Sequence, residues 1–139
     1  MPRLIAAVAL AAFLASGPTM AGDAEVKSAQ QVIRNQFEAF LADDPALAYS
    51  FAAPNIKRIF PTQQSFMSMV ESGYMPVRRP QSYAFGKSQE MSATSIVQQV
   101  LLVGPDGKNY EAVYTLELQP DGSWLITGVS MRASNALST

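Results

Sequence analysis

The sequence predicts an α+β domain in which three N-terminal helices pack on a curved antiparallel meander of about four strands. Apolar residues recur at helical spacing as far as Gly73, and beyond it they alternate with polar residues. Two Pro-Asp-Gly turns, at residues 105–107 and 120–122, separate the alternating runs. Helices followed by strands are typical of the α+β class, with the helices on one face of the sheet.

The first helix is expected over residues 24–43, because the apolar residues in this range share one face of a helix. They are Val26, Ile33, Phe37, Phe40 and Leu41. Charged residues such as Lys27 and Glu38 occupy the other side. The pattern indicates one amphipathic helix with a single buried stripe.

Two shorter helices are indicated by their first residues. Asp44 is followed by Pro45, which is the order of an N-cap and a first helical position, so a second helix is expected over residues 45–53. Thr62 is the expected N-cap of a third helix, and Gly73 ends it.

The strands are assigned from the alternation of apolar and polar residues. Residues 82–91 form one expected strand, and residues 96–103 are apolar at nearly every position, as in a strand covered on both faces. One face of the next strand carries Tyr110, Ala112, Tyr114, Leu116 and Leu118. One face of the last strand carries Trp124, Ile126 and Gly128.

Residues 1–21 have the features of a secretory signal peptide. Arg3 precedes an apolar run at residues 4–15, and Thr19 and Ala21 place small residues at the cleavage site. The run is too short to cross the roughly 30 Å of a bilayer core, so no stable membrane anchor is expected after cleavage. We expect cleavage after Ala21, which leaves residues 22–139 as a single exported domain.

The composition excludes several classes of function. The 139 residues include no Cys and no His, which excludes disulfides, Cys- or His-based metal sites and Cys or His nucleophile–base pairs. Ten Lys and Arg stand against eleven Asp and Glu, and this balance argues against a nucleic-acid binder. We therefore expect no metal, no cofactor and no nucleic-acid partner.

Three side chains with polar atoms share the apolar face of the predicted sheet. They are Gln98, Tyr114 and Trp124, and each needs a hydrogen-bond partner when it is buried. They satisfy one another, bridge through water, or contact a ligand. With Phe37 from the first helix, they form a candidate cavity for a small apolar or carboxylate ligand.

A second candidate site is the basic pair Arg78 and Arg79, which stands between Pro76 and Pro80. The two prolines predict an extended backbone that holds the arginines in place. The pair then forms a small basic patch for a carboxylate or a phosphate, and the alternative is that both are solvated charges at an edge.

Two further clusters have structural interpretations that we prefer. Asp43 and Asp44 form the only acidic pair, and paired carboxylates can act as acid and base, but Asp44 is needed as a helix cap. Met67 and Met69, with Met75, are the residue type that binds copper(I). Residues two apart on a helix point away from each other, so these methionines are expected to fill the core.

Three stretches carry a resemblance to a known family. They read QFEAFLADDPALAYSFAAPNI at residues 36–56, SFMSMVESGYMPVRRP at 65–80 and DGSWLITGV at 121–129. Their order and spacing resemble an uncharacterised bacterial family of exported domains, the domain of unknown function DUF4864, with a nuclear transport factor 2-like fold. The resemblance implies a cone of sheet closed by helices and a periplasmic location, and it brings no catalytic residue. Arg78 stands where we expect an aromatic residue in that family.

Two classes of function follow from this resemblance. One is a non-enzymatic periplasmic module that binds a small ligand in the cone or docks on a partner through the sheet. The other is a small lyase or isomerase of the ketosteroid isomerase-like type, whose relatives use an Asp base inside the cone. Strand parity places Glu111 and Glu117 on the face opposite Tyr114, which favours the first class. A homodimer through the sheet, common in this fold, would bury Val113, Thr115, Leu125 and Thr127.

Overall fold

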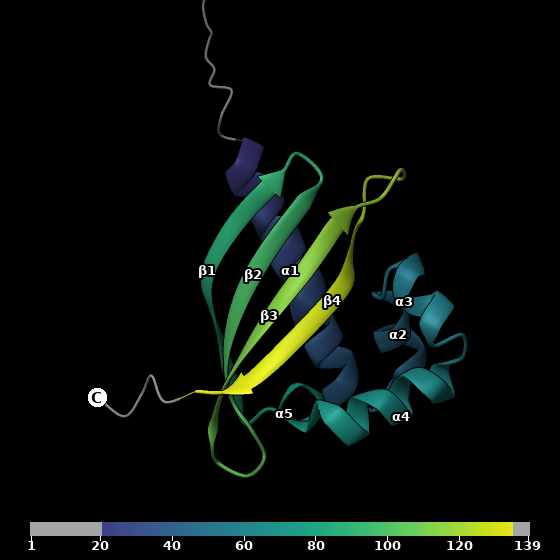
Figure 1. Ribbon diagram of the computed structural model, residues 1–139, viewed down its shortest axis with the longest axis vertical. Coiled ribbons are helices and arrows are strands. Elements are labelled where there is room, and N and C mark those ends of the chain that lie inside the picture. The colour runs from purple at the N-terminus through teal and green to yellow at the C-terminus, as the bar shows by residue number, and fades with distance from the viewer. Residues whose placement is uncertain (1–20, 135–139) are drawn as a thin grey trace, which may run out of the picture.

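The computed structural model describes residues 21–134 as an antiparallel sheet with one long helix across its inner face (Figure 1). Three of the four short helices lie beyond one edge of the sheet, and the last lies near the C-terminal end of the long helix. The helices are α1 (Ala21–Leu41), α2 (Pro45–Ser50), α3 (Pro54–Ile59), α4 (Gln63–Gly73) and α5 (Met75–Arg78). The strands, paired in the order β1-β2-β3-β4, are β1 (Ser82–Ser92), β2 (Ser95–Val103), β3 (Asn109–Leu118) and β4 (Trp124–Ala133). The α+β class is confirmed.

The predicted leader, apart from its last residue, lies outside the described residues. Among residues 21–134, none of the helices combines the length and the apolar composition that a membrane crossing requires.

The helix caps expected from the sequence are present. The Asp44 side chain accepts a hydrogen bond from the Leu47 amide at 3.1 Å at the start of α2. At the start of α4, Thr62 and Ser65 form a reciprocal capping box. Gly73 is the last residue of α4, as predicted.

Two short helices depart from the sequence prediction. The second predicted helix ends at Ser50, and α3 begins at Pro54, where only a helix end was expected. Helix α5 occupies part of the segment at residues 74–80, so the prediction of an extended backbone there is wrong. Pro76 stands in the first turn of α5, where a missing N–H is not needed, so the proline is compatible with the helix.

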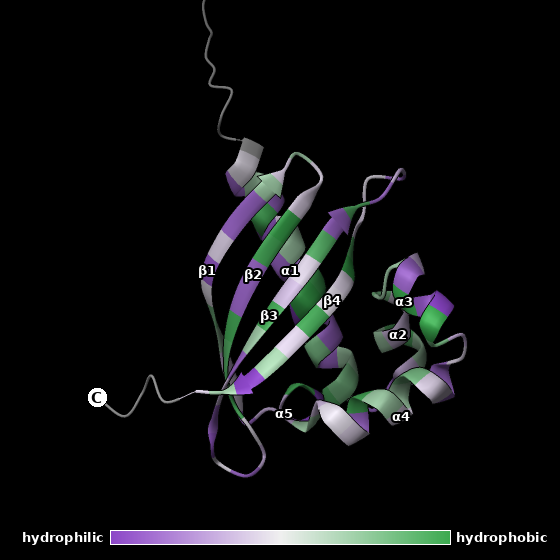
Figure 2. Ribbon diagram, in the orientation of Figure 1, coloured by the Kyte–Doolittle hydropathy of each residue, from purple (hydrophilic) through white to green (hydrophobic). Residues whose placement is uncertain are grey.

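The core lies between the inner face of the sheet and α1. Its largest fully buried side chains include Ile33, Phe37, Ile96, Tyr114 and Leu116. The rings of Phe37 and Tyr114 meet edge to face, with their centroids 6.0 Å apart. Figure 2 shows β1 as mostly hydrophilic and the middle strands as more hydrophobic.

The prediction that residues 96–103 are covered on both faces is wrong. In β2, fully buried residues alternate with half-buried ones, because the helices cover only the inner face. The residues expected at a dimer interface, Val113, Thr115, Leu125 and Thr127, are half-buried. The homodimer stays a prediction.

A β-bulge in β4 changes which residues face inward. Thr115 pairs with Gly128 and Leu116 pairs with Ile126, so Thr127 is the extra residue. Beyond the bulge, Val129 pairs with Tyr114 and shares its inner face, whereas Gly128 pairs with a residue of the outer face. The prediction that Gly128 shares the face of Trp124 is therefore wrong, because a single inserted residue reverses the alternation.

The chain between α2 and α3 pairs with β4 at this bulge. The Ala53 amide donates to the Ile126 carbonyl at 2.8 Å, and the Ile126 amide donates to the Phe51 carbonyl at 2.9 Å. These bonds join the short helices to the edge of the sheet.

A candidate ligand cavity beside β4

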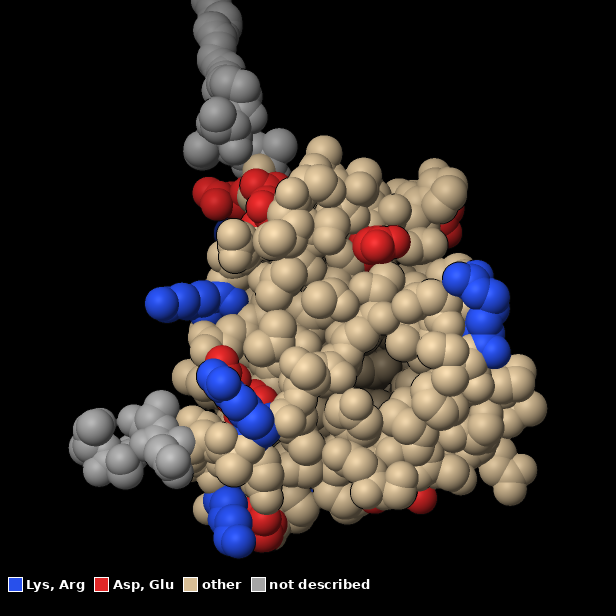
Figure 3. All heavy atoms as spheres, in the orientation of Figure 1, with Lys and Arg blue, Asp and Glu red and all other residues tan. Residues whose placement is uncertain are grey.

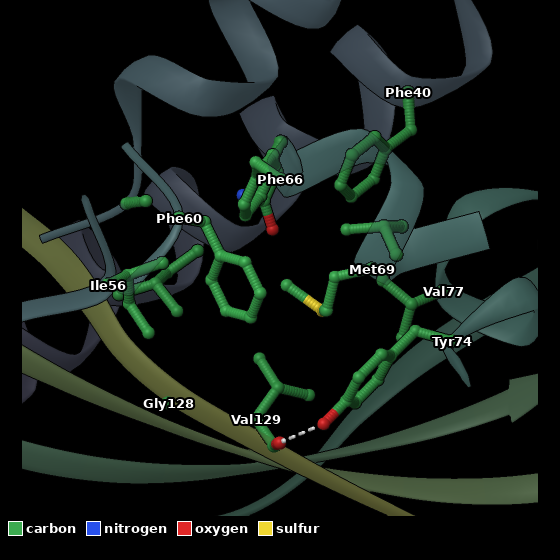
Figure 4. Close-up of a pocket in the computed structure, with 13 residues that line it drawn as sticks. Phe40, Ile56, Phe60, Phe66, Met69, Tyr74, Val77, Gly128 and Val129 are labelled. Carbon is green, nitrogen blue, oxygen red and sulfur yellow. Dashed lines mark hydrogen bonds between the residues drawn. The ribbon is translucent and has the colours of Figure 1, made fainter. Parts of the chain in front are cut away.

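A cavity of about 220 Å³ lies between β4, α3 and α4 (Figure 4). The space-filling view shows a hollow in this face of the molecule beside β4, and no charged side chain stands at its rim (Figure 3). The cavity therefore opens to solvent through an uncharged mouth.

Helix α4 supplies one wall of the cavity. Phe66, Met69 and Val70 line it, and their spacing of three and four residues places them on one face of the helix. The capping box at Thr62 fixes where α4 begins and so where this face points. In Figure 4 the thioether of Met69 extends into the cavity.

The other walls come from segments that are distant in the sequence. Ile56 belongs to α3 and Phe60 follows it, and both side chains point toward the cavity in Figure 4. Helix α1 contributes Gln36 and Phe40, one helical turn apart. The remaining lining residues are Ala52, Tyr74, Val77, Ile126, Gly128 and Val129.

Two of the lining residues, Gln36 and Tyr74, carry polar side-chain atoms. Gln36 is 5% exposed, and its Nε2 atom donates to the Ala48 carbonyl at 3.0 Å. The Tyr74 hydroxyl donates to the Val129 carbonyl at 3.3 Å. Among the described residues that line the cavity there is no Asp, Glu, Lys or Arg. The walls can hold an apolar molecule and offer no carboxylate for proton transfer.

The four residues predicted to form a ligand cavity share the inner face but do not line this cavity. Phe37, Gln98, Tyr114 and Trp124 are all buried between the sheet and α1. The prediction is corrected in this respect: α1 covers the middle of the sheet completely, so these side chains belong to the core.

Gln98 has a structural role that explains its burial. The register of β1 shifts between Phe85 and Ser88, and the Nε2 atom of Gln98 donates to the Gly86 and Lys87 carbonyls within this irregularity. Its Oε1 atom accepts from Gln30 of α1 at 3.0 Å. Gln98 is thus satisfied internally, which was one of the alternatives open at the level of sequence.

Trp124 and Tyr114 differ in how their polar atoms are satisfied. The Trp124 indole N–H donates to Glu25 Oε1 at 2.9 Å. The Tyr114 hydroxyl is buried and has no hydrogen-bond partner among the described residues. Burial raises the pKa of the Tyr114 phenol, so this side chain stays neutral.

Arg78 and Arg79 bind the end of α1. Arg78, 8% exposed, donates to the Phe40 carbonyl at 2.5 Å and to Asp43 at 2.9 Å. Arg79 donates to the Leu41 carbonyl at 3.2 Å and also contacts Asp43. Both guanidinium groups therefore have partners within the protein, and they neutralise the negative end of the α1 dipole.

The two acidic residues at the end of α1 have separate tasks. Asp43 adopts a left-handed backbone conformation (φ 57°), and Asp44 caps α2. The Arg78 guanidinium is the main group that holds the pKa of the Asp43 carboxyl below its usual range, and Arg79 adds to this effect. The pair does not form an acid–base dyad.

Gln36 was missed at the level of sequence, although the pattern marks it. It lies three residues after Ile33 and four before Phe40, within the buried stripe of the first helix. A polar residue in such a stripe indicates a buried hydrogen bond. Ile56 and Phe60 carried no comparable signal, because the sequence did not predict the helix that places them.

Comparison with known proteins identifies a family and a fold. The model of a domain of unknown function, DUF4864, matches residues 23–139. A solved NTF-2-like protein of unknown function from Shewanella oneidensis is 12% identical, with a TM-score of 0.54 over 77% of this chain and 98% of that chain. A solved protein from Catenulispora acidiphila is 15% identical, with a TM-score of 0.54 over 86% of this chain and 98% of that chain. No curated protein matches. At these identities the structural likeness shows an NTF-2-like fold and nothing about activity.

Proposed function

The chain belongs to the DUF4864 family of domains of unknown function, and we propose that it is a non-enzymatic module that binds a small apolar ligand in the cavity beside β4. The observation that carries this proposal is the composition of the cavity wall. Eleven of the thirteen lining residues are apolar or glycine, and the other two each donate one hydrogen bond to a backbone carbonyl of the protein. Concave, largely apolar sites with a few placed polar groups are typical of ligand sites.

The size of the cavity is sufficient for a ring-sized ligand. An engineered cavity of roughly 150 Å³ lined by Leu, Ile and Phe stays dry and binds benzene. The cavity beside β4 is larger, at about 220 Å³, and it is open at its mouth. A single aromatic ring or a short branched aliphatic chain fits this volume.

The same wall argues against the lyase or isomerase alternative. An acid–base mechanism of the ketosteroid isomerase-like type needs a carboxylate inside the cavity, with a pKa suited to proton transfer. Neither an Asp nor a Glu is among the lining residues described, and Glu25 is engaged by the indole of Trp124. Binding is therefore the function that the geometry supports.

The proposal includes export to the periplasm. It is supported by the order of charge, apolar run and small residues in residues 1–21, and by a family match that begins at residue 23. The intact mass of the exported product is expected to correspond to a chain that begins at Gly22. Recovery of the uncleaved chain in the membrane fraction would contradict this part of the proposal.

Ligand binding is tested by calorimetric titration of the exported protein with toluene. We expect saturable binding that Val129→Phe abolishes, because the new ring occupies the cavity. Ser130→Phe is the matched control, since Ser130 is the exposed neighbour of Val129 on the same strand, and it is expected to leave binding intact. No saturable heat up to the solubility of toluene, or equal binding by Val129→Phe, would refute the proposal.

A further inference from the structure

The polar groups of the cavity beside β4 indicate the chemical class of its ligand. We infer that the ligand is a neutral apolar molecule that donates one hydrogen bond, such as a phenol or an alcohol, and that Gln36 receives this bond. The inference rests on the proposed function and narrows it. It follows from the orientation of two side chains, Gln36 and Tyr74.

The orientation of the Gln36 amide is fixed by its partner. A backbone carbonyl only accepts hydrogen bonds, so the atom of Gln36 that lies 3.0 Å from the Ala48 carbonyl oxygen is the nitrogen. The oxygen atom, Oε1, is then the free end of the amide. Within residues 21–134 no donor lies within hydrogen-bond distance of Oε1. Oε1 is also not one of the polar side-chain atoms that are inaccessible to solvent and lack a partner. Since Gln36 is 5% exposed and lines the cavity, Oε1 offers an acceptor to a molecule bound there.

Tyr74 presents the same kind of group. Its hydroxyl proton is used by the Val129 carbonyl, at an oxygen–oxygen distance of 3.3 Å, as the dashed line in Figure 4 shows. The phenol oxygen keeps lone pairs that can accept a hydrogen bond. Both polar side chains of the cavity therefore offer an acceptor to a donor on the ligand.

A carboxylate ligand is disfavoured by the same arrangement. The Gln36 Oε1 atom and the Tyr74 phenol oxygen both carry partial negative charge, which repels an anion. No Lys or Arg is found among the described residues that line the cavity. Arg78 comes near Phe40, with 5.9 Å from its guanidinium carbon to the ring centroid, but its terminal nitrogens donate to the Phe40 carbonyl and to Asp43. Its charge is also compensated by Glu71, whose Oε2 atom lies 3.6 Å from the Arg78 Nε atom. An anion in this cavity would lose its hydration without a cation in exchange. Of the two ligand types expected from the sequence, the apolar type is the one that fits.

The test compares four ligands that share one ring size. The exported protein is titrated calorimetrically at pH 7 with p-cresol, p-methylanisole, toluene and p-toluate. At this pH p-cresol is neutral, since phenols ionise near pH 10. We expect p-cresol to bind about fivefold more tightly than p-methylanisole, which keeps the oxygen but lacks the donor, and p-toluate to show no binding.

A variant assigns this preference to Gln36. In Gln36→Met, which keeps the length of the side chain and removes the acceptor, the preference for p-cresol over p-methylanisole is expected to disappear. Tighter binding of p-methylanisole or of p-toluate than of p-cresol to the native protein would overturn the inference and leave the proposed function standing. Failure of all four ligands to bind would overturn the proposed function itself. Because the comparison of ligands uses the native protein, it decides the question even if Gln36→Met does not fold.

Discussion

Tyr114 is a buried side chain whose hydroxyl has no hydrogen-bond partner within the described chain. Its ring packs against Phe37 in the core. On folding, the hydroxyl loses its hydrogen bonds to water and gains none within the described chain. The residue contributes by its volume and its apolar area, and its polar atom opposes folding.

Replacing Tyr114 with Phe is therefore expected to stabilise the protein, by about 1 kcal/mol. Urea unfolding followed by the fluorescence of Trp124, the one tryptophan of the chain, measures the change. Tyr49→Phe is the matched control, because the Tyr49 hydroxyl donates to the Phe60 carbonyl at 2.6 Å, and its removal is expected to destabilise. If Tyr114→Phe destabilised the protein as much as Tyr49→Phe, the hydroxyl would have a partner and the account of the core would be wrong.

Asp43 connects the end of α1 to the two arginines of the α5 segment. Its folded pKa is lowered, chiefly by the hydrogen bond from Arg78. A lowered folded pKa stabilises the native state above the unfolded value, near 3.9, and this stabilisation is lost as the pH falls through the folded pKa. Since the side chain of Asp43 is 62% exposed, the effect is modest and is screened by salt.

Asp43→Asn is expected to lower the melting temperature at pH 7 and to lose this deficit below about pH 4. Asn tolerates the left-handed backbone of residue 43, so the variant removes the charge without straining the chain. Melting temperatures of both proteins between pH 2 and pH 7 provide the measurement. A deficit that stayed constant down to pH 2 would mean that the ion pairs do not stabilise the fold.

At the scale of elements, the sequence is informative where an element is long or capped by a side chain. The long helix, the capped helices α2 and α4 and the strands all followed from periodicity and caps. The helices α3 and α5, of six and four residues, are too short for a helical period to be recognised, and each carries a proline in its first turn. A proline there is equally consistent with an extended segment, so the sequence could not decide.

The location of the cavity escaped prediction for a related reason. The alternation of side chains along a strand predicts which sheet face each residue occupies only as far as a β-bulge. The bulge at Thr127 turns Val129 to the inner face, where it lines the cavity. Ile56 and Phe60 face it from a helix that the sequence did not reveal. Gln36 was missed as well, although a polar residue in an apolar stripe can be recognised without the structure.

Helix α4 is the element whose start determines one wall of the cavity. Thr62→Ala removes the side chain that accepts from the Ser65 amide, and a loss of about 1 kcal/mol in the free energy of unfolding is expected. Asp44→Ala, which removes the cap of α2, is expected to cost a similar amount and to leave the position of α4 unchanged. Urea unfolding measures both. A change below about 0.3 kcal/mol for Thr62→Ala would show that tertiary packing alone positions α4.

At the scale of the whole molecule, the cavity lies where the long helix does not cover the sheet. Helix α1 crosses the inner face and closes the middle of the sheet with a dense core (Figure 1). The short helices extend the fold beyond β4, and the space between them and the strand stays open to solvent (Figure 3). A domain with a densely packed core and a separate apolar cavity at one edge can bind a small molecule without rearranging its core.

The central claim, that this space is a ligand site, is tested most directly by NMR of the protein labelled at its methionine methyl groups. Met69 lines the cavity, whereas Met91, 58% exposed on β1, lies away from it. We expect toluene to shift the Met69 methyl resonance saturably through the ring current of the bound ligand and to leave that of Met91 unchanged, with Met69→Leu providing the assignment. A Met69 signal that stays constant up to the solubility of toluene, or that moves no more than that of Met91, would contradict the account.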